Sequence, residues 1–118
     1  MAHQQRVMIY KIFRDEEWRR LEREGETPGA PVDIADGFIH FSTAATLAET
    51  ARRHFNGEGG LWLAAVAPEP LGAALKWEPS RGGVEFPHLY RPLLLSDIAW
   101  CRPLPLGPSG HRFPADLA

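Results

Sequence analysis

The sequence predicts an α+β domain in which two early helices pack on a mainly antiparallel sheet. Apolar residues at helical spacing occur in the first half of the chain, where strand, helix, strand and helix follow one another. The second half alternates short apolar runs with turns that contain Pro and Gly, which is typical of consecutive antiparallel strands. Because helices do not continue to alternate with strands, a doubly wound parallel sheet is not expected. The length of 118 residues fits a single domain, 1–118, with its own core.

The first elements are a strand and a charged helix. Residues 7–13 form an apolar run that predicts a central strand. Asp15 is the expected N-cap of a helix over residues 16–24, and Gly25 ends it. Residues 26–35 contain two prolines and a glycine, so we predict a loop there, beside a cleft.

The stretch that follows is the candidate site. Phe38 to Phe41 reads as a strand, and Ser42 or Thr43 is placed to cap a second helix that ends near residue 55. Alternation along a strand puts His40 and Ser42 on one face. An imidazole and a hydroxyl beside a helix N-terminus form a candidate anion site. The alternative is a half-buried strand histidine bonded to the backbone, with the serine as a cap.

The second half of the chain supplies the remaining strands. The apolar run at 61–67 predicts a strand covered on both faces. Residues 74–78 alternate, with Lys76 and Glu78 on one side, and residues 79–83 suit a hairpin turn. The strand resumes at 84–86, where Pro87 predicts an edge or a bend. A last strand covers 93–100, and the Pro- and Gly-rich segment 102–118 is predicted to be a C-terminal surface tail, extended or partly disordered.

Composition excludes several classes of function. The net charge of −2 argues against general nucleic-acid binding and against a membrane-surface binder. Cys101 stands alone, so no disulfide framework is expected. No segment resembles a signal peptide, and no apolar run approaches the ~18 residues of a membrane span, so we expect a cytoplasmic protein.

The motifs exclude some chemistry and leave other chemistry open. The five histidines lack metal-ligand spacing, so no metal is expected. His40 and Ser42 point in parallel and make a poor nucleophile–base pair. Glu78 and Glu85 across the hairpin would resemble a carboxylate dyad, although surface glutamates give the same pattern. A few polar residues on strands and turns suggest a ligand site, and an exposed sheet face would look similar: Lys11, His40, Ser42, Lys76, Glu78, Arg81, Glu85, His88 and Tyr90.

Four motifs in order resemble the domain-of-unknown-function family numbered 952, from about residue 10 to residue 100. They are residues 36–43, 54–55, 75–78 and 86–90. The fold implied by this resemblance is similar to that of the ADP-ribosyltransferases, with two early helices on a split sheet. The stretch Phe38-Ile39-His40-Phe41-Ser42 is also similar to a strand of the tRNA 2′-phosphotransferases. Where those enzymes carry His-Gly-Thr on the first strand, this chain has residues 10–12, Tyr-Lys-Ile.

By this likeness His40 and Ser42 line a cleft for NAD or ADP-ribose, and NAD is the cofactor that the resemblance implies. Transfer of ADP-ribose passes through an oxocarbenium-like state that a carboxylate stabilises, and Glu78 is the candidate, with Glu85 second. Phosphates would be held by Lys76, Arg81 and the helix N-terminus at Ser42 and Thr43. The remaining candidates are Tyr90, which would stack on a ring, and His40 or His88, which would hydrogen-bond ribose or base.

We therefore expect a small cytoplasmic protein that binds a nucleotide or another small molecule, with transferase activity as one hypothesis. The alternative is a non-catalytic ligand-binding or protein-interaction domain, which Lys11 on the first strand favours.

Overall fold

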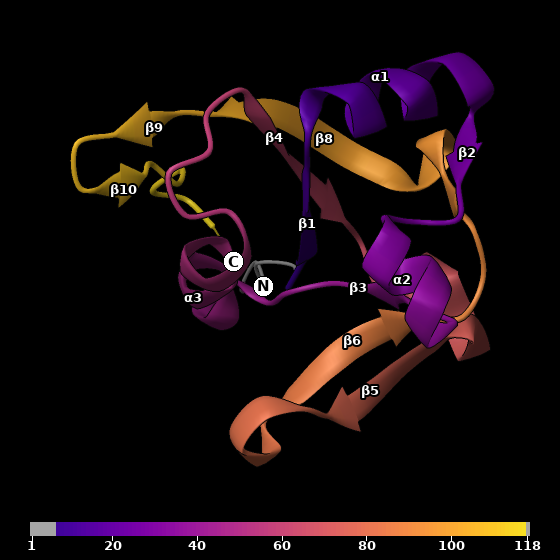
Figure 1. Cartoon of the computed structure of the whole chain (residues 1–118). Helices are drawn as coiled ribbons and strands as arrows, with labels where there is room; N and C mark the ends of the chain where they lie inside the picture. The colour runs from indigo at the N-terminus through magenta and orange to yellow at the C-terminus, as the bar shows by residue number, and fades with distance from the viewer. Residues whose placement is uncertain (1–6, 118) are drawn as a thin grey trace, which may run out of the picture.

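Two three-stranded antiparallel sheets form the centre of the protein, whose computed structural model describes residues 7–117 (Figure 1). One bridge between Tyr10 and Ser42 connects them, with both N–O distances at 2.8 Å. The first sheet has the order β1-β4-β8 and consists of β1 (Ile9–Phe13), β4 (Leu61–Val66) and β8 (Ile98–Leu104). The second has the order β3-β6-β5 and consists of β3 (Ile39–His40), β6 (Glu85–Leu89) and β5 (Leu75–Pro79).

Short elements complete the chain. Two further antiparallel pairs are β2 (Glu26–Thr27) with β7 (Leu93–Leu94), and β9 (Leu106–Gly107) with β10 (Gly110–His111). Three 3₁₀ turns are η1 (Glu69–Ala74), η2 (Arg81–Gly83) and η3 (Leu95–Asp97). The prediction of an α+β fold with mainly antiparallel strands is confirmed.

The two predicted helices are present. The first, α1 (Asp15–Glu24), begins one residue earlier than expected, with Arg14 at its N-cap, and ends at Gly25. The second, α3 (Ala44–His54), has Thr43 as its N-cap, and the Thr43 hydroxyl accepts a hydrogen bond from the N–H of Thr46 at 3.3 Å. Of the two expected caps, threonine is therefore the one used.

A third helix, α2 (Pro31–Asp36), occupies the segment that we predict as a loop, so that prediction is wrong. Proline at its first position is pre-set for a helix, and Gly37 ends it in the left-handed conformation, with φ 86°. Six residues give too few apolar positions for a helical period to show. This helix carries the residue on which the site depends.

The first sheet is covered on both faces, as the sequence predicts for 61–67. On one face, Ile9, Phe13, Ala64 and Val66 pack with Trp18 and Leu21 of α1. On the other face, Tyr10, Ile12, Leu63 and Ala65 pack with Leu47 and Ala51 of α3. One helix therefore covers each face, and alternation along β1 and β4 produces both cores.

An edge strand, one of the two alternatives predicted at Pro87, is wrong, because β6 is the middle strand of its sheet. Pro87 lies opposite Trp77, and its carbonyl accepts a hydrogen bond from the N–H of Phe41 at 3.0 Å. The missing N–H of proline is tolerated because the carbonyl supplies the contact with the neighbouring strand.

Much of the segment that we predict as a C-terminal tail is paired. Strand β8 continues to Leu104, which is opposite Leu61 and 1 % exposed. Further on, the β9–β10 hairpin forms, and Phe113 and Leu117 pack against the core beside α3. The prolines are compatible with β8 because it is an edge strand. Within residues 7–117, no helix has the length and hydrophobicity needed to cross a membrane.

Candidate functional site

A hollow of about 460 Å³ lies where the two sheets meet. Its walls come from β1, α2, β3, α3 and β6, so it combines segments far apart in the sequence. Three of the predicted site residues line it, namely His40, Ser42 and His88. Lining residues that the prediction omits from the site include Asp33, Asp36, Arg14 and Thr50.

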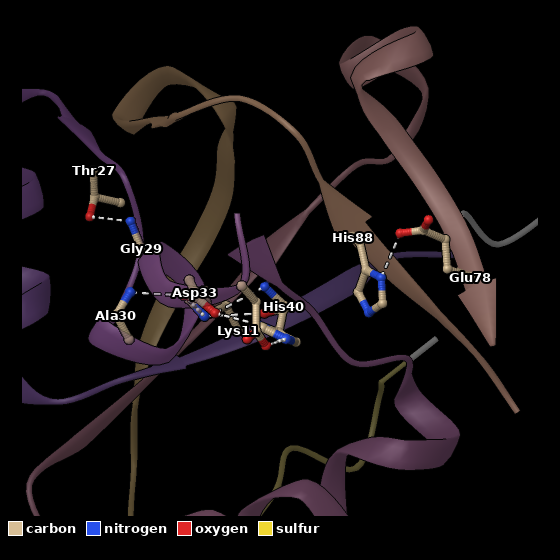
Figure 2. Close-up of polar contacts among 9 residues, drawn as sticks. Lys11, Thr27, Gly29, Ala30, Asp33, His40, Glu78 and His88 are labelled. Atoms are coloured by element: carbon tan, nitrogen blue, oxygen red, sulfur yellow. Dashed lines mark hydrogen bonds and ion pairs between the residues drawn. The ribbon is translucent and has the colours of Figure 1, made fainter. Parts of the chain in front are cut away.

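The centre of the site is a buried carboxylate bound to an imidazole and an ammonium group (Figure 2). Asp33 Oδ1 lies 2.6 Å from His40 Nδ1, and its Oδ2 lies 2.9 Å from Lys11 Nζ. The backbone N–H of His40 also donates to Oδ1, at 3.1 Å, and that of Ala30 to Oδ2, at 2.8 Å. Four donors therefore fix one carboxylate, whose side chain is 0 % exposed.

The charge of Asp33 follows from these partners. Burial alone raises the pKa of its carboxyl group, but the hydrogen bond with His40 and the charge of Lys11 outweigh burial and lower that pKa from 3.8 to about 2. Asp33 is therefore ionised throughout the physiological range. A fixed carboxylate at Nδ1 orients the imidazole, whose residue lines the hollow.

A second carboxylate meets the other ring nitrogen. His40 Nε2 lies 3.0 Å from Asp36 Oδ2, and the Asp36 side chain is 48 % exposed. The His40 side chain is 35 % exposed, so this outer contact is open to water. The two carboxylates of α2 thus differ: the inner one is fixed in the protein, and the outer one lies at its surface.

The two hydroxyl residues of the predicted site have structural partners. Ser42 is 4 % exposed, and its Oγ lies 2.8 Å from Thr50 Oγ1 inside the hollow. Thr43 caps α3 and does not line the hollow in the described part of the chain. Of these two residues, Ser42 is therefore the one that lines the hollow.

The pairing of strands places His40, His88 and Lys76 in one row, because His40 is opposite His88 and His88 is opposite Lys76. Paired residues of antiparallel strands share a face. Glu78 is on the same face, two residues along, and its Oε1 lies 2.8 Å from His88 Nδ1 and accepts from Tyr90 Oη at 2.7 Å. The hydrogen bonds with Tyr90 and His88 lower the pKa of the Glu78 carboxyl group.

The remaining predicted site residues whose side chains the structure describes do not line the hollow. Glu78, Lys76 and Tyr90 do not line it, and the ammonium of Lys76 lies 5.1 Å from the centre of the Tyr90 ring. Glu85 is opposite Pro79 and Glu78 is opposite Phe86, so the two glutamates do not form a directly opposed dyad. The side chain of Arg81 lies outside what the structure describes.

Two residues that the prediction does not name as site residues, Asp33 and Asp36, hold the imidazole. A signal for Asp33 is present in the sequence: Pro31 followed by an aspartate two positions later is typical of the first turn of a helix. Only the structure shows that Gly29 packs closely on Asp33, because a Cβ there would lie 2.6 Å from it. Lys11 is among the predicted polar residues, but its ion pair with Asp33 has no local signature.

Metal ligation does not explain this cluster. Among the residues that the structure describes, no group of three or more His, Cys, Asp or Glu side chains is arranged to hold a metal ion. Asp33, Asp36 and His40 instead bind one another and Lys11.

The family of the chain follows from comparison with known proteins. A family model described as "Protein of unknown function (DUF952)" matches residues 12–101, and the chain belongs to that family. This match confirms the family predicted from the four sequence motifs. No curated protein matches the chain.

Solved structures of a relative show the same fold. The crystal structure of protein CC0527 from Caulobacter crescentus is 49 % identical in sequence, with a TM-score of 0.85, and the match covers 88 % of this chain and 91 % of that one. A solution NMR structure of CC0527 gives 49 % identity, a TM-score of 0.80, and coverage of 88 % and 90 %. The architecture described above is therefore similar to one determined by experiment.

Proposed function

We propose that the hollow binds a small phosphorylated ligand of the NAD or ADP-ribose type, in a cleft similar to that of the ADP-ribosyltransferases. The observation that carries this proposal is His40, which lines the hollow and is held at Nδ1 by a buried carboxylate. Preformed polar groups that converge beside apolar wall residues are typical of small-molecule sites.

The size and lining of the hollow support this class of ligand. A volume of about 460 Å³ is within the range of roughly 300–1,000 Å³ that small-molecule pockets span. Apolar wall residues such as Val32 and Phe55 suit a base or a nicotinamide ring, and Ser42 and Thr50 offer hydroxyl groups to a ribose. Arg14 also lines the hollow, although its guanidinium is bound to Glu58 at 3.0 Å through two nitrogens.

Transferase activity is the stronger form of this proposal. It needs a carboxylate near the anomeric carbon, the role for which the sequence predicts Glu78. Because Glu78 does not line the hollow, it would not lie at the anomeric carbon of a ligand there. Its contact with His88 Nδ1 instead makes it a positioning residue for His88, which does line the hollow.

A non-catalytic ligand-binding domain is the second candidate, and Lys11 favours it. Its ammonium is 2.9 Å from Asp33 and donates to the carbonyl of His40 at 3.1 Å, so it serves the internal structure of the site. The tRNA 2′-phosphotransferases, by the resemblance above, have His-Gly-Thr on this strand. At the corresponding place this chain has Lys11, whose ammonium binds Asp33 and the carbonyl of His40.

The test is a titration with NAD, ADP-ribose and a 2′-phosphorylated RNA oligonucleotide, followed by calorimetry and by melting temperature. A ligand at one hundred times its Kd stabilises the folded state by about 2.7 kcal/mol. We expect saturable stabilisation by one of these ligands, lost in His40→Ala and kept in His111→Ala, whose ring lies outside the hollow. No response to any of the three would contradict the proposal. Release of nicotinamide from NAD separates an enzyme from a binding domain.

A further inference from the structure

We propose that His40 Nε2 is the contact point for an anionic group of the ligand, a phosphate, and that Asp36 fills this position while the hollow is empty. This inference rests on the proposed function in assuming that the hollow takes a ligand. It adds that a phosphate of the ligand contacts His40 Nε2, and that Asp36 moves away when the ligand binds.

The first argument is the hydrogen-bonding capacity of the ring. Nδ1 lies 2.6 Å from Asp33 and Nε2 lies 3.0 Å from Asp36, so both ring nitrogens face carboxylate oxygens. A neutral imidazole has one N–H, whereas an imidazolium has two. A protonated ring would therefore have a carboxylate beside each N–H, as a hydrogen bond at Asp33 and as an ion pair at Asp36. The other titratable groups near His40 are the Lys11 ammonium from β1, which donates to the His40 carbonyl, and the ring of His88 from β6, 5.4 Å away, and the uncharged ring of Phe38 lies 4.7 Å away.

The second argument is the balance of charge. With His40 protonated, the ring and Lys11 would carry two positive charges against the two negative charges of Asp33 and Asp36, and the group would be neutral. If Asp36 turns away from the protonated ring, the charge at Nε2 is left unmatched beside the hollow. A phosphate oxygen at Nε2 would replace the charge of Asp36 there.

The third argument is the difference between the two carboxylates. Asp33 has four donors and no exposed side-chain surface, so it cannot leave without disrupting α2. The Asp36 side chain is 48 % exposed, and His40 is its ion-pair partner. Asp36 is also the last residue of α2, where a negative charge gains nothing from the helix dipole. Exposed ion pairs of this kind contribute little to stability, so a ligand displaces Asp36 at low cost.

The experiment compares wild type with Asp36→Asn, using inorganic pyrophosphate as the probe and following the ring nitrogens of His40 by NMR. The amide that replaces the carboxylate does not carry the competing charge, so we expect pyrophosphate to bind about two- to fivefold more tightly, the range set by an exposed ion pair. Glu69→Gln removes an exposed charge outside the hollow and is the control for net charge. His40→Ala should lose the binding in both backgrounds.

Two results would overturn the inference. One is Asp36→Asn binding pyrophosphate no more tightly than Glu69→Gln does. The other is binding of pyrophosphate without a shift of His40 Nε2.

Comparing ADP-ribose with adenosine, which has no phosphate, tests whether the group that meets His40 is a phosphate of the ligand. We expect Asp36→Asn to bind ADP-ribose more tightly than wild type does, and adenosine no more tightly. Failure of the proposed function is distinguishable, because ADP-ribose would then not bind while pyrophosphate still shifts the His40 ring. Melting temperatures of each variant confirm that the comparison is made between folded proteins.

Discussion

The buried ion pair between Asp33 and Lys11 provides the sharpest test of how this site is held together. Asp33→Asn keeps the shape of the side chain and removes its charge. Lys11, with its side chain 10 % exposed, is then left without a compensating charge. Breaking a buried pair in this way costs about 3–5 kcal/mol of unfolding free energy. Asp36→Asn, in the same helix with a 48 % exposed side chain, is the matched control and should cost less than about 1 kcal/mol.

The same carboxylate predicts how stability depends on pH. Its pKa is about 2 in the folded protein and 3.8 ordinarily, so the folded state is favoured while Asp33 is ionised. The stabilisation is complete above the ordinary pKa and is lost as pH falls towards 2. At 1.36 kcal/mol for each pKa unit, the difference corresponds to about 2 kcal/mol. The cost of Asp33→Asn should therefore shrink by about this amount between about pH 5 and pH 2.

The assay is urea unfolding of wild type and both variants at pH 7, 5 and 2, followed by tryptophan fluorescence. Other carboxylates titrate in all three proteins, so the difference between variants isolates Asp33. The reasoning is refuted if Asp33→Asn is no more destabilising than Asp36→Asn at pH 7. It is also refuted if the cost of Asp33→Asn is the same at pH 5 and pH 2.

Two further predictions concern the C-terminal part of the chain. Burial, and then the charge of Glu22, raise the pKa of the Cys101 thiol from 9.0 to about 12. At pH 8 this thiol should therefore react with a thiol reagent about a thousandfold more slowly in the folded protein than in urea-unfolded protein. Equal reaction rates in the two states would contradict this prediction. Leu104→Ala should cost about 2–5 kcal/mol in urea unfolding because the residue is 1 % exposed, whereas Leu106→Ala, at 42 % exposed, should change stability by less than about 0.5 kcal/mol. Similarly small losses of unfolding free energy in both variants would indicate that this segment is a surface tail, as the sequence predicts.

Part of the candidate site follows from local pattern. Alternation along residues 38–42 places His40 and Ser42 on one face, and both line the hollow. His88 also lines the hollow, and the sequence marks it only as one of the polar residues on strands and turns. The roles of Glu78 and Lys76 were not accessible in this way, because their distance from the hollow depends on the order of strands. In the order β3-β6-β5, the middle strand separates them from His40.

The sequence by itself determined the elements whose signals are local. Helices α1 and α3, the strand at 61–66 buried on both faces, and the family motifs all depend on residues close together in the chain. Tertiary structure decided which charges meet. Asp33 reaches His40 because α2 folds back against β3, and Lys11 reaches both because β1 passes beside them. An ion pair between distant residues leaves no local period in the sequence, since its energy depends on burial and distance, which exist only once the chain has folded.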